Sequence, residues 1–130
     1  MKRLEALDNQ FEKKRLLLIN GQYRESLSKQ TFDVINPATE QLICQVSAGQ
    51  KQDVDLAVNA ATNALKEWSD TVPSQRSLLM NNFATLIQAN MKELAVIESM
   101  DNGKPLMKAK QDVFACIMLF RYYAGACERI

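Results

Sequence analysis

Thiols are the side chains in this sequence with the clearest capacity for covalent chemistry. The chain has three cysteines, Cys44, Cys116 and Cys127. A catalytic thiol needs a nearby cation or a helix N-terminus, together with access to substrate. Cys44 lies in an extended pattern and Cys116 on the apolar side of a helical pattern, so we expect both to be small core residues. Cys127 lies near a helix end, where the helix dipole disfavours negative charge, and is a poor nucleophile.

Other common catalytic and cofactor sites lack the residues that they need. The sequence has no histidine, which removes the base of a Ser-His-Asp arrangement and most ligands of a zinc site. Its four glycines, Gly21, Gly49, Gly103 and Gly125, are far apart, whereas a dinucleotide-binding loop needs three glycines within about six residues. An odd number of cysteines without a CxxC pair argues against a disulfide framework. We therefore predict no catalytic residue, no cofactor-binding residue and no transition-metal site.

Length and charge narrow the class of protein. A chain of 130 residues is large enough for one domain at most. Its 16 basic and 15 acidic residues leave a net charge of +1, so the basic surface of a nucleic-acid-binding protein is not expected. Residues 1–14 carry acidic side chains and lack an apolar run, which predicts a polar arm, with Leu4, Leu7 and Phe11 as a weak stripe, and not a signal peptide or membrane span. We expect a cytoplasmic protein that binds neither nucleic acid nor membrane.

An extended pattern occupies about residues 15–47 and predicts a short β-strand meander. Strands are expected at residues 16–20, 22–24, 31–36 and 42–47, which are rich in Leu, Ile, Val and aromatic residues. Asn20 and Gly21 separate the first two strands, and both residues accept the positive φ of a type I′ turn. Asn36 and Pro37 mark the second turn.

After Gly49 the apolar period changes from two residues to about 3.6, which predicts three α-helices. They are expected at about 51–68, 74–100 and 105–130. The first carries an apolar stripe made of Val54, Ala57, Val58, Ala61, Leu65 and Trp68. The second is expected to bury Leu79, Phe83, Leu86, Ile87, Leu94 and Ile97. The third is expected to bury Ala109, Val113, Cys116, Ile117, Phe120 and Ala124.

The corner between the second and third helices reads MDNGKP, from Met100 to Pro105. Asn102 and Gly103 tolerate positive φ and end a helix, and Pro105 suits the first turn of the next one. No Gly, Pro or polar turn follows the last apolar residues of the third helix. We therefore expect that helix to run to Ile130 without a cap on its final carbonyls, so that the sequence reads as cut.

Several ordered segments resemble the N-terminal part of the aldehyde dehydrogenase superfamily. They are VINPATE at Val34–Glu40, LICQVSAG at Leu42–Gly49, Glu98–Pro105 and RYYAG at Arg121–Gly125. The resemblance runs from about Leu16 to Ile130. It implies an α/β fold in which the strands and helices of residues 15–130 are the N-terminal part of a Rossmann-like NAD(P)-binding domain that is incomplete in this chain.

The resemblance also implies an oxidoreductase reaction. In the family a cysteine thiolate attacks an aldehyde, hydride passes to NAD or NADP, and water releases the carboxylic acid. The family's catalytic cysteine, general-base glutamate, oxyanion asparagine and cofactor loop lie downstream of this segment, and their motifs do not occur here. We therefore expect an N-terminal fragment that binds no NAD(P) and oxidises no aldehyde by itself. The alternative is a non-catalytic regulatory module that docks onto a full-length dehydrogenase subunit.

Two lesser sites are implied by position in the family. Many members bind a monovalent cation through carbonyls that map to Val34 and Ile35 and an acidic residue that maps to Asp101. Na⁺ or K⁺ would suit such oxygen ligands. The alternative is that Asp101 only accepts backbone hydrogen bonds at a helix end. The family's third helix lines the mouth of the aldehyde tunnel, which maps to Gln111 and Ala115, four residues apart on one helical face, with Phe114 at the border. Ordinary surface or packing is the alternative there.

Overall fold

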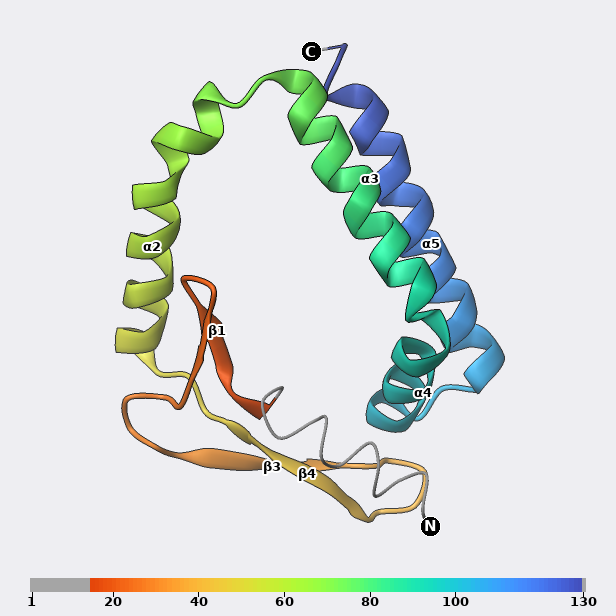
Figure 1. Cartoon of the computed structure of the whole chain (residues 1–130). Coiled ribbons are helices and arrows are strands. Elements are labelled where there is room, and N and C mark those ends of the chain that lie inside the picture. Colours follow the sequence, from red (N-terminus) through yellow and green to blue (C-terminus); the bar gives the residue numbers. More distant parts are fainter. Residues whose placement is uncertain (1–14, 130) are drawn as a thin grey trace. The chain divides into compact units, whose positions relative to one another are not determined.

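The chain forms two units in the computed structural model, which describes residues 15–129. The first unit contains residues 15–35 and Leu42–Ser69, and holds four strands and one helix. The second contains Asn36–Gln41 and residues 70–129, and holds three helices (Figure 1). No helix among the described residues is long and apolar enough to cross a membrane. The expected arm at residues 1–14 lies outside the described residues.

The first two strands form a tight antiparallel hairpin. β1 (Leu17–Ile19) pairs with β2 (Gln22–Arg24). Asn20 has φ 53° and Gly21 has φ 72°, so both residues adopt the left-handed backbone that a type I′ turn needs. The turn predicted from this dipeptide is therefore confirmed.

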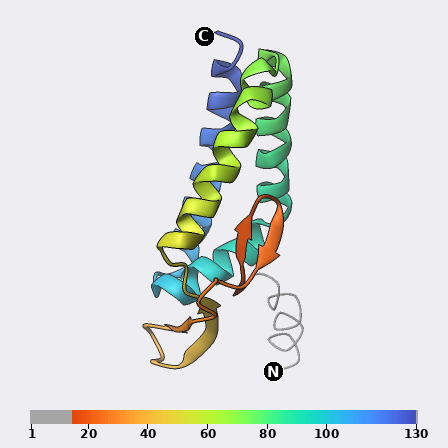
Figure 2. The same cartoon turned by 90° about the vertical axis from the view of Figure 1, so that its left-hand side faces the viewer.

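The other two strands form a second hairpin of their own. β3 (Thr31–Ile35) pairs antiparallel with β4 (Leu42–Ser47), with an irregularity in register between Val34 and Ile35. The two hairpins are separate two-stranded sheets, visible as separate ribbons in Figure 2, and not the continuous meander expected from the sequence. In the link between the hairpins, the carbonyl of the buried Ser26 accepts from the N–H of Lys29, and the Ser26 hydroxyl donates to the carbonyl of Gln30. The polar groups of Ser26 therefore find partners within the link.

A buried carboxylate fixes the start of the first helix, α2 (Lys51–Asp70). Asp53 is only 2% exposed, and its two oxygens accept from the backbone N–H groups of Gln50 at 2.9 Å and Leu27 at 3.0 Å. The bond from Gln50 is one half of a capping box, in which the third helical residue reaches back to the residue before the helix. The bond from Leu27 ties the link between the hairpins to the same helix end. Asp53 therefore holds both the start of α2 and the link between the hairpins.

The predicted helix at 74–100 is two helices in the structure. α3 covers Pro73–Ala89 and α4 covers Met91–Asn102, with Asn90 between them at φ −100° and ψ 11°. The Asn90 side chain donates to the carbonyl of Leu86 at 2.8 Å, in addition to the backbone N–H of Asn90 at 3.1 Å. An asparagine that bonds back to the helix backbone in this way weakens its continuation. Apolar periodicity cannot reveal such a break, because the apolar pattern continues from α3 through Asn90 into α4.

The last helix, α5, spans Leu106–Ala126 and ends before the chain does. The expectation that it would run to the last residue with uncapped carbonyls is therefore wrong. The Cys127 N–H donates to Tyr123 and Ala124, and the Nε of Arg129 donates to the carbonyl of Gly125 at 3.0 Å. Basic side chains near a helix C-terminus cap the last carbonyls in this way.

Small side chains make the core of the second unit. α5 packs along α3 and against α4, as the element contacts and Figure 1 indicate. The buried apolar residues are Ala84, Ala95, Ala109, Ile117 and Ala124. Phe83 of α3 meets Phe120 of α5 edge to face, with ring centroids 4.8 Å apart. Alanines at these positions let the helix backbones approach closely. Six residues of α5 were predicted to be buried, and three are confirmed as buried while the other three are half-buried: Ala109, Ile117 and Ala124, and Val113, Cys116 and Phe120, respectively.

Burial predicted for α3 and α4 is largely wrong. Leu79 and Leu86 are 52% and 61% exposed, and Leu94 is 37% exposed. α3 turns Ala84 and Ser77 inward instead, because helix contact through small residues leaves the neighbouring leucines on the uncovered flank. Large apolar side chains are also exposed along α2, with Val54, Val58, Leu65 and Trp68 all at 48% or more.

Candidate functional site

The two strongest sequence motifs meet in space. Pro37 of VINPATE packs on Gly103 of MDNGKP, so closely that a Cβ placed on Gly103 would lie 2.7 Å from the Pro37 Cγ. Pro37 is presented by an Asx turn in which the Asn36 side chain accepts from Ala38 N at 2.9 Å. Gly103 has φ 78°, so it serves as the left-handed cap of α4 as well as the surface on which Pro37 rests.

Short polar contacts hold the corner between α4 and α5 in one shape. The Gly103 N–H donates to the Ser99 carbonyl at 3.0 Å, and the Ser99 hydroxyl donates to the Lys104 carbonyl at 2.7 Å. These bonds satisfy carbonyl groups that a helix end leaves without intrahelical partners. Pro105 then precedes α5 in an extended conformation. The helix stop and start predicted from MDNGKP are therefore confirmed.

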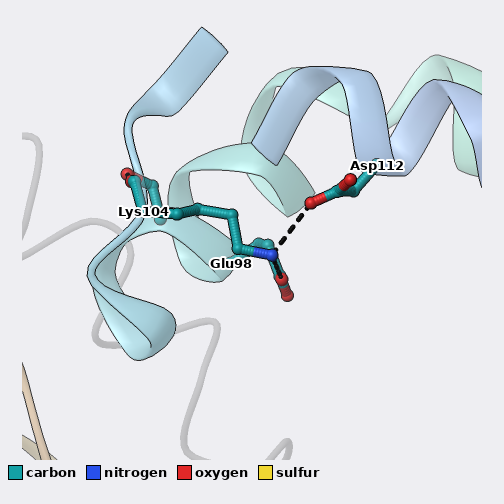
Figure 3. Close-up of polar contacts among 4 residues, drawn as sticks. Glu98, Lys104 and Asp112 are labelled. Carbon is teal, nitrogen blue, oxygen red and sulfur yellow. Dashed lines mark hydrogen bonds and ion pairs between the residues drawn. The ribbon is translucent and has the colours of Figure 1, made fainter. Parts of the chain in front are cut away.

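Lys104 joins both helices of the corner. Its ammonium donates to the Glu98 carboxylate of α4 at 2.6 Å and to the Asp112 carboxylate of α5 at 2.8 Å (Figure 3). The side chain of Lys104 is 25% exposed. The hydrogen bonds from Asp112 and then Glu98 raise the pKa of Lys104 above its ordinary value of 10.5. The amine therefore stays charged at neutral pH, which suits an ion pair and not a nucleophile or base.

The three residues assigned to a monovalent cation come from different parts of the fold. Val34 and Ile35 lie at the end of β3 in the first unit, and Asp101 lies exposed in the last turn of α4 in the second. Asn36 directly follows this strand and uses its own carbonyl to accept from Glu40 N at 2.8 Å. The cation assignment stays a prediction.

The three residues assigned to the tunnel mouth share one exposed flank of α5. Gln111, Phe114 and Ala115 are all exposed, and the Phe114 ring keeps 55% of its surface accessible. Met118 and Tyr122 continue the flank toward the C-terminus at 49% and 66% exposure. This grouping agrees with helical spacing, and the role in a tunnel stays a prediction.

The three thiols of the chain lie among apolar or carbonyl neighbours. Cys44 is half-buried in β4, opposite Val34, and Cys116 is half-buried on α5 beside the buried Ile117. Cys127 lies at the C-terminus of α5, with its sulfur 3.6 Å from that of Met80 and 3.4 Å from the Tyr123 carbonyl. Neither of these neighbours is a base that could activate the thiol for nucleophilic attack.

Lys104 and its two carboxylates were missed in the sequence. Glu98 precedes Lys104 by six residues and Asp112 follows it by eight, and neither spacing is the three or four that marks a pair on one helix. Only the geometry of the corner brings these charges together. The contact of Pro37 with Gly103 could not be predicted from the sequence either, because it also depends on how the fold brings two distant segments together.

Comparisons with known proteins agree with the motifs. The family model for the aldehyde dehydrogenase family matches residues 23–130. The chain is 42% identical to an aldehyde dehydrogenase of Davidiella tassiana and 39% identical to a mitochondrial aldehyde dehydrogenase of Equus caballus. These matches cover 88% and 87% of this chain but 23% of each relative. The chain therefore spans about a quarter of the length of these relatives.

Solved structures give the same result. Betaine aldehyde dehydrogenase from Staphylococcus aureus in complex with NAD⁺ matches with a TM-score of 0.87 and 31% identity, covering 94% of this chain and 25% of that one. An aldehyde dehydrogenase from Bacillus cereus matches with a TM-score of 0.86 and 34% identity, covering 92% and 25%. The fold is thus part of the fold that these enzymes share. By its family match, sequence identity and fold, the chain belongs to the aldehyde dehydrogenase family.

Proposed function

We propose that this chain supplies the N-terminal scaffold of an NAD(P)-dependent aldehyde dehydrogenase and contributes no reacting group. The observation that carries the proposal is the coverage: nearly all of the chain matches about a quarter of each relative. A complete enzyme would oxidise an aldehyde to a carboxylic acid with NAD or NADP as the acceptor. In it, the corner made by Gly103, Lys104 and Pro37 would fix how α4 and α5 are presented to later parts of the fold.

The chain by itself is proposed to be inactive because it lacks the chemistry. Its three thiols sit among apolar or carbonyl neighbours, and the sequence has neither a histidine nor a glycine cluster for a dinucleotide. Sequencing the transcript tests the scaffold assignment. We expect the reading frame to continue past Ile130 into a glycine-rich cofactor loop and a cysteine nucleophile. A stop codon directly after Ile130 would contradict it and favour the second function below.

A docking module is the second candidate function, and exposed apolar surface favours it. α5 presents Met107, Leu119, Tyr122 and Tyr123 to solvent at 54% to 66% exposure, while its other face is packed. A helix that is apolar on both faces is normally covered on both. Co-purification of the tagged chain with a full-length dehydrogenase would support this function. Recovery of the tagged chain without the dehydrogenase, although the dehydrogenase is present in excess, would exclude the docking function.

The tunnel assignment can be tested in an enzyme that contains this segment. We propose that Ala115→Met narrows the aldehyde entrance and lowers kcat/KM for bulky aldehydes more than for short ones. Lys110→Met on the same helix is the control, since position 110 lies about 140° around the helix axis from Ala115. Equal effects on all aldehydes, or equal effects of both variants, would contradict the assignment.

The cation assignment is supported by the exposed carboxylate of Asp101 at the end of α4. We propose that Na⁺ or K⁺ binds there together with the carbonyls of Val34 and Ile35. A crystal of the complete enzyme soaked in a heavier alkali ion should give an anomalous peak beside the Asp101 carboxylate. Absence of that peak, with peaks elsewhere in the same crystal, would leave Asp101 as a helix-end residue.

A further inference from the structure

The sequence contains the dipeptide Asn-Gly twice, in two very different backbone settings. Asn20–Gly21 forms the turn between β1 and β2, and Asn102–Gly103 ends α4. This dipeptide has its own chemistry. The glycine nitrogen attacks the side-chain amide carbon of asparagine, a C–N bond forms, and the amide nitrogen leaves as ammonia. Water then opens the resulting succinimide to aspartate or isoaspartate, so the asparagine becomes a carboxylate without any other reactant.

The reaction needs an accessible glycine nitrogen and a backbone that can move. Both are present at Asn20–Gly21. The two residues are exposed, and a Cβ placed on Gly21 would meet no atom within 4 Å. The strands on either side have three residues each and belong to an isolated two-stranded sheet. Such hairpins are marginally stable and open at low free energy.

The same dipeptide is locked at the corner of the second unit. The attacking nitrogen of Gly103 is already engaged, because its N–H donates to the Ser99 carbonyl at 3.0 Å. Pro37 lies against the glycine, where a Cβ would be 2.7 Å from its Cγ. The Ser99 hydroxyl and the Lys104 ammonium fix the residues on both sides. Attack by this nitrogen requires the corner to unfold first.

We propose that Asn20 is a site of spontaneous deamidation in the folded chain, and that the corner protects Asn102 from the same reaction. The isoaspartate product adds one carbon to the backbone of a two-residue turn, which no longer matches the pairing of Ile19 with Gln22. The product also carries a new negative charge. Leu17 of β1 lies against Gly49, since a Cβ placed on Gly49 would be 3.6 Å from the Leu17 Cδ2. Opening of the hairpin therefore reaches the segment that leads into α2.

Peptide mapping by mass spectrometry of the full 130-residue chain tests the proposal. The chain is held in mildly alkaline buffer, and conversion at Asn20 and at Asn102 is followed in the same sample. We expect Asn20 to convert at least about tenfold faster than Asn102, since only the second reaction waits for local unfolding. In concentrated urea the two rates should become similar, because the local sequences then decide. Similar rates in the native buffer, or faster conversion at Asn102, would overturn the proposal.

A matched variant separates the effect of charge from that of the longer backbone. Asn20→Asp introduces the same carboxylate without the extra carbon, and aspartate tolerates the left-handed turn. Hydrogen exchange of residues 17–24 should stay unchanged in Asn20→Asp and become faster in the isoaspartate form purified from the aged chain. Equal protection in both forms would contradict the predicted opening of the hairpin.

Discussion

At the scale of single residues, Lys104 makes the most informative contacts of the corner. One ammonium holds carboxylates from two helices, Glu98 and Asp112. Because the pKa of Lys104 is raised in the fold, the stabilisation is fully present below the ordinary value of 10.5 and is lost as the pH rises through the higher folded value. The corner is therefore insensitive to pH in the neutral range.

Replacing Lys104 should loosen the corner without unfolding the helices. In Lys104→Met, we expect amide exchange at Gly103 to become about two- to fivefold faster, because partly exposed ion pairs make modest contributions. Lys108→Met, which replaces an exposed lysine of α5, is the control. Hydrogen exchange followed by mass spectrometry makes the measurement. Equal effects of the two variants would mean that the pairs with Glu98 and Asp112 are not stabilising.

Asp53 should make the first unit sensitive to acid. Backbone hydrogen bonds from Gln50 and then Leu27 hold the pKa of this carboxyl below its ordinary value of 3.8. Its stabilisation is therefore present above 3.8 and is lost as the pH falls through the lower folded value. Asp53→Asn should speed exchange of the Leu27 and Gln50 amides at neutral pH, since a neutral acceptor replaces a charged one.

The control for Asp53 is its exposed neighbour Asp55. Asp55 pairs with Lys51 at 2.6 Å, but its side chain is 54% exposed and that of Lys51 is 87% exposed. Asp55→Asn should leave exchange of the Leu27 and Gln50 amides nearly unchanged. If both variants had the same effect, helix-dipole charge alone would explain the role of Asp53.

Gly103 and Gly21 offer a matched pair of substitutions. Both have positive φ, and the backbone strain of a non-glycine residue there costs about 1–3 kcal/mol. Only Gly103→Ala also drives a Cβ into Pro37, at 2.7 Å from its Cγ, whereas Gly21→Ala enters open space. We expect the free energy of unfolding, from urea titration followed by circular dichroism, to fall further in Gly103→Ala. An equal or smaller loss would show that Pro37 moves aside without cost.

At the scale of elements, local chemistry could be predicted from the sequence and long-range contacts could not. The Asn20–Gly21 turn and the helix end at Gly103 depend on positive φ angles. Asn and Gly accept such angles, so both features can be predicted from residue type. The break at Asn90 depends on one side chain bonding to the Leu86 carbonyl, and helical periodicity passes through it unchanged. The cap by Arg129 is similarly a contact that periodicity does not encode.

Burial was predictable for α5 and not for α3, for a geometrical reason. α5 contacts both α3 and α4, so its inner face is covered. α3 is covered on the side of Ala84, which leaves Leu79 and Leu86 exposed although they belong to the same apolar pattern. A pattern reports which faces are apolar, and only the packing partners decide which of them is buried.

Truncation of the buried isoleucine of α5 should be costly. Ile117 is 1% exposed and is the largest buried apolar side chain of the second unit. Ile117→Ala should lower the free energy of unfolding by about 2–5 kcal/mol, through lost transfer energy and an unfilled cavity. Met118→Ala is the control, because the next residue is 49% exposed and should cost less than about 1 kcal/mol. Urea titration monitored by circular dichroism compares the two, and equal costs would contradict the packing.

In the molecule as a whole, large apolar side chains remain exposed in both units. Exposed large apolar residues occur on α2, α3 and α5. Where such residues gather into a large patch, the patch usually marks a place where other protein is bound. The family could be identified from ordered motifs, because VINPATE and MDNGKP are surface turns whose residues are constrained by their contact. The reaction could not be predicted from residues of this chain, because the family resemblance implies that the reacting groups lie downstream of this segment.

We propose that these residues carry part of the fold of an aldehyde dehydrogenase without its reacting groups. Reduction of NAD⁺ and NADP⁺ by the purified 130-residue chain, with short, long and aromatic aldehydes, tests it most directly. A complete aldehyde dehydrogenase in the same assay serves as the positive control. We expect a rate equal to that of the protein-free blank for every aldehyde. Turnover above that blank, lost on mutation of Cys44, Cys116 or Cys127, would contradict it.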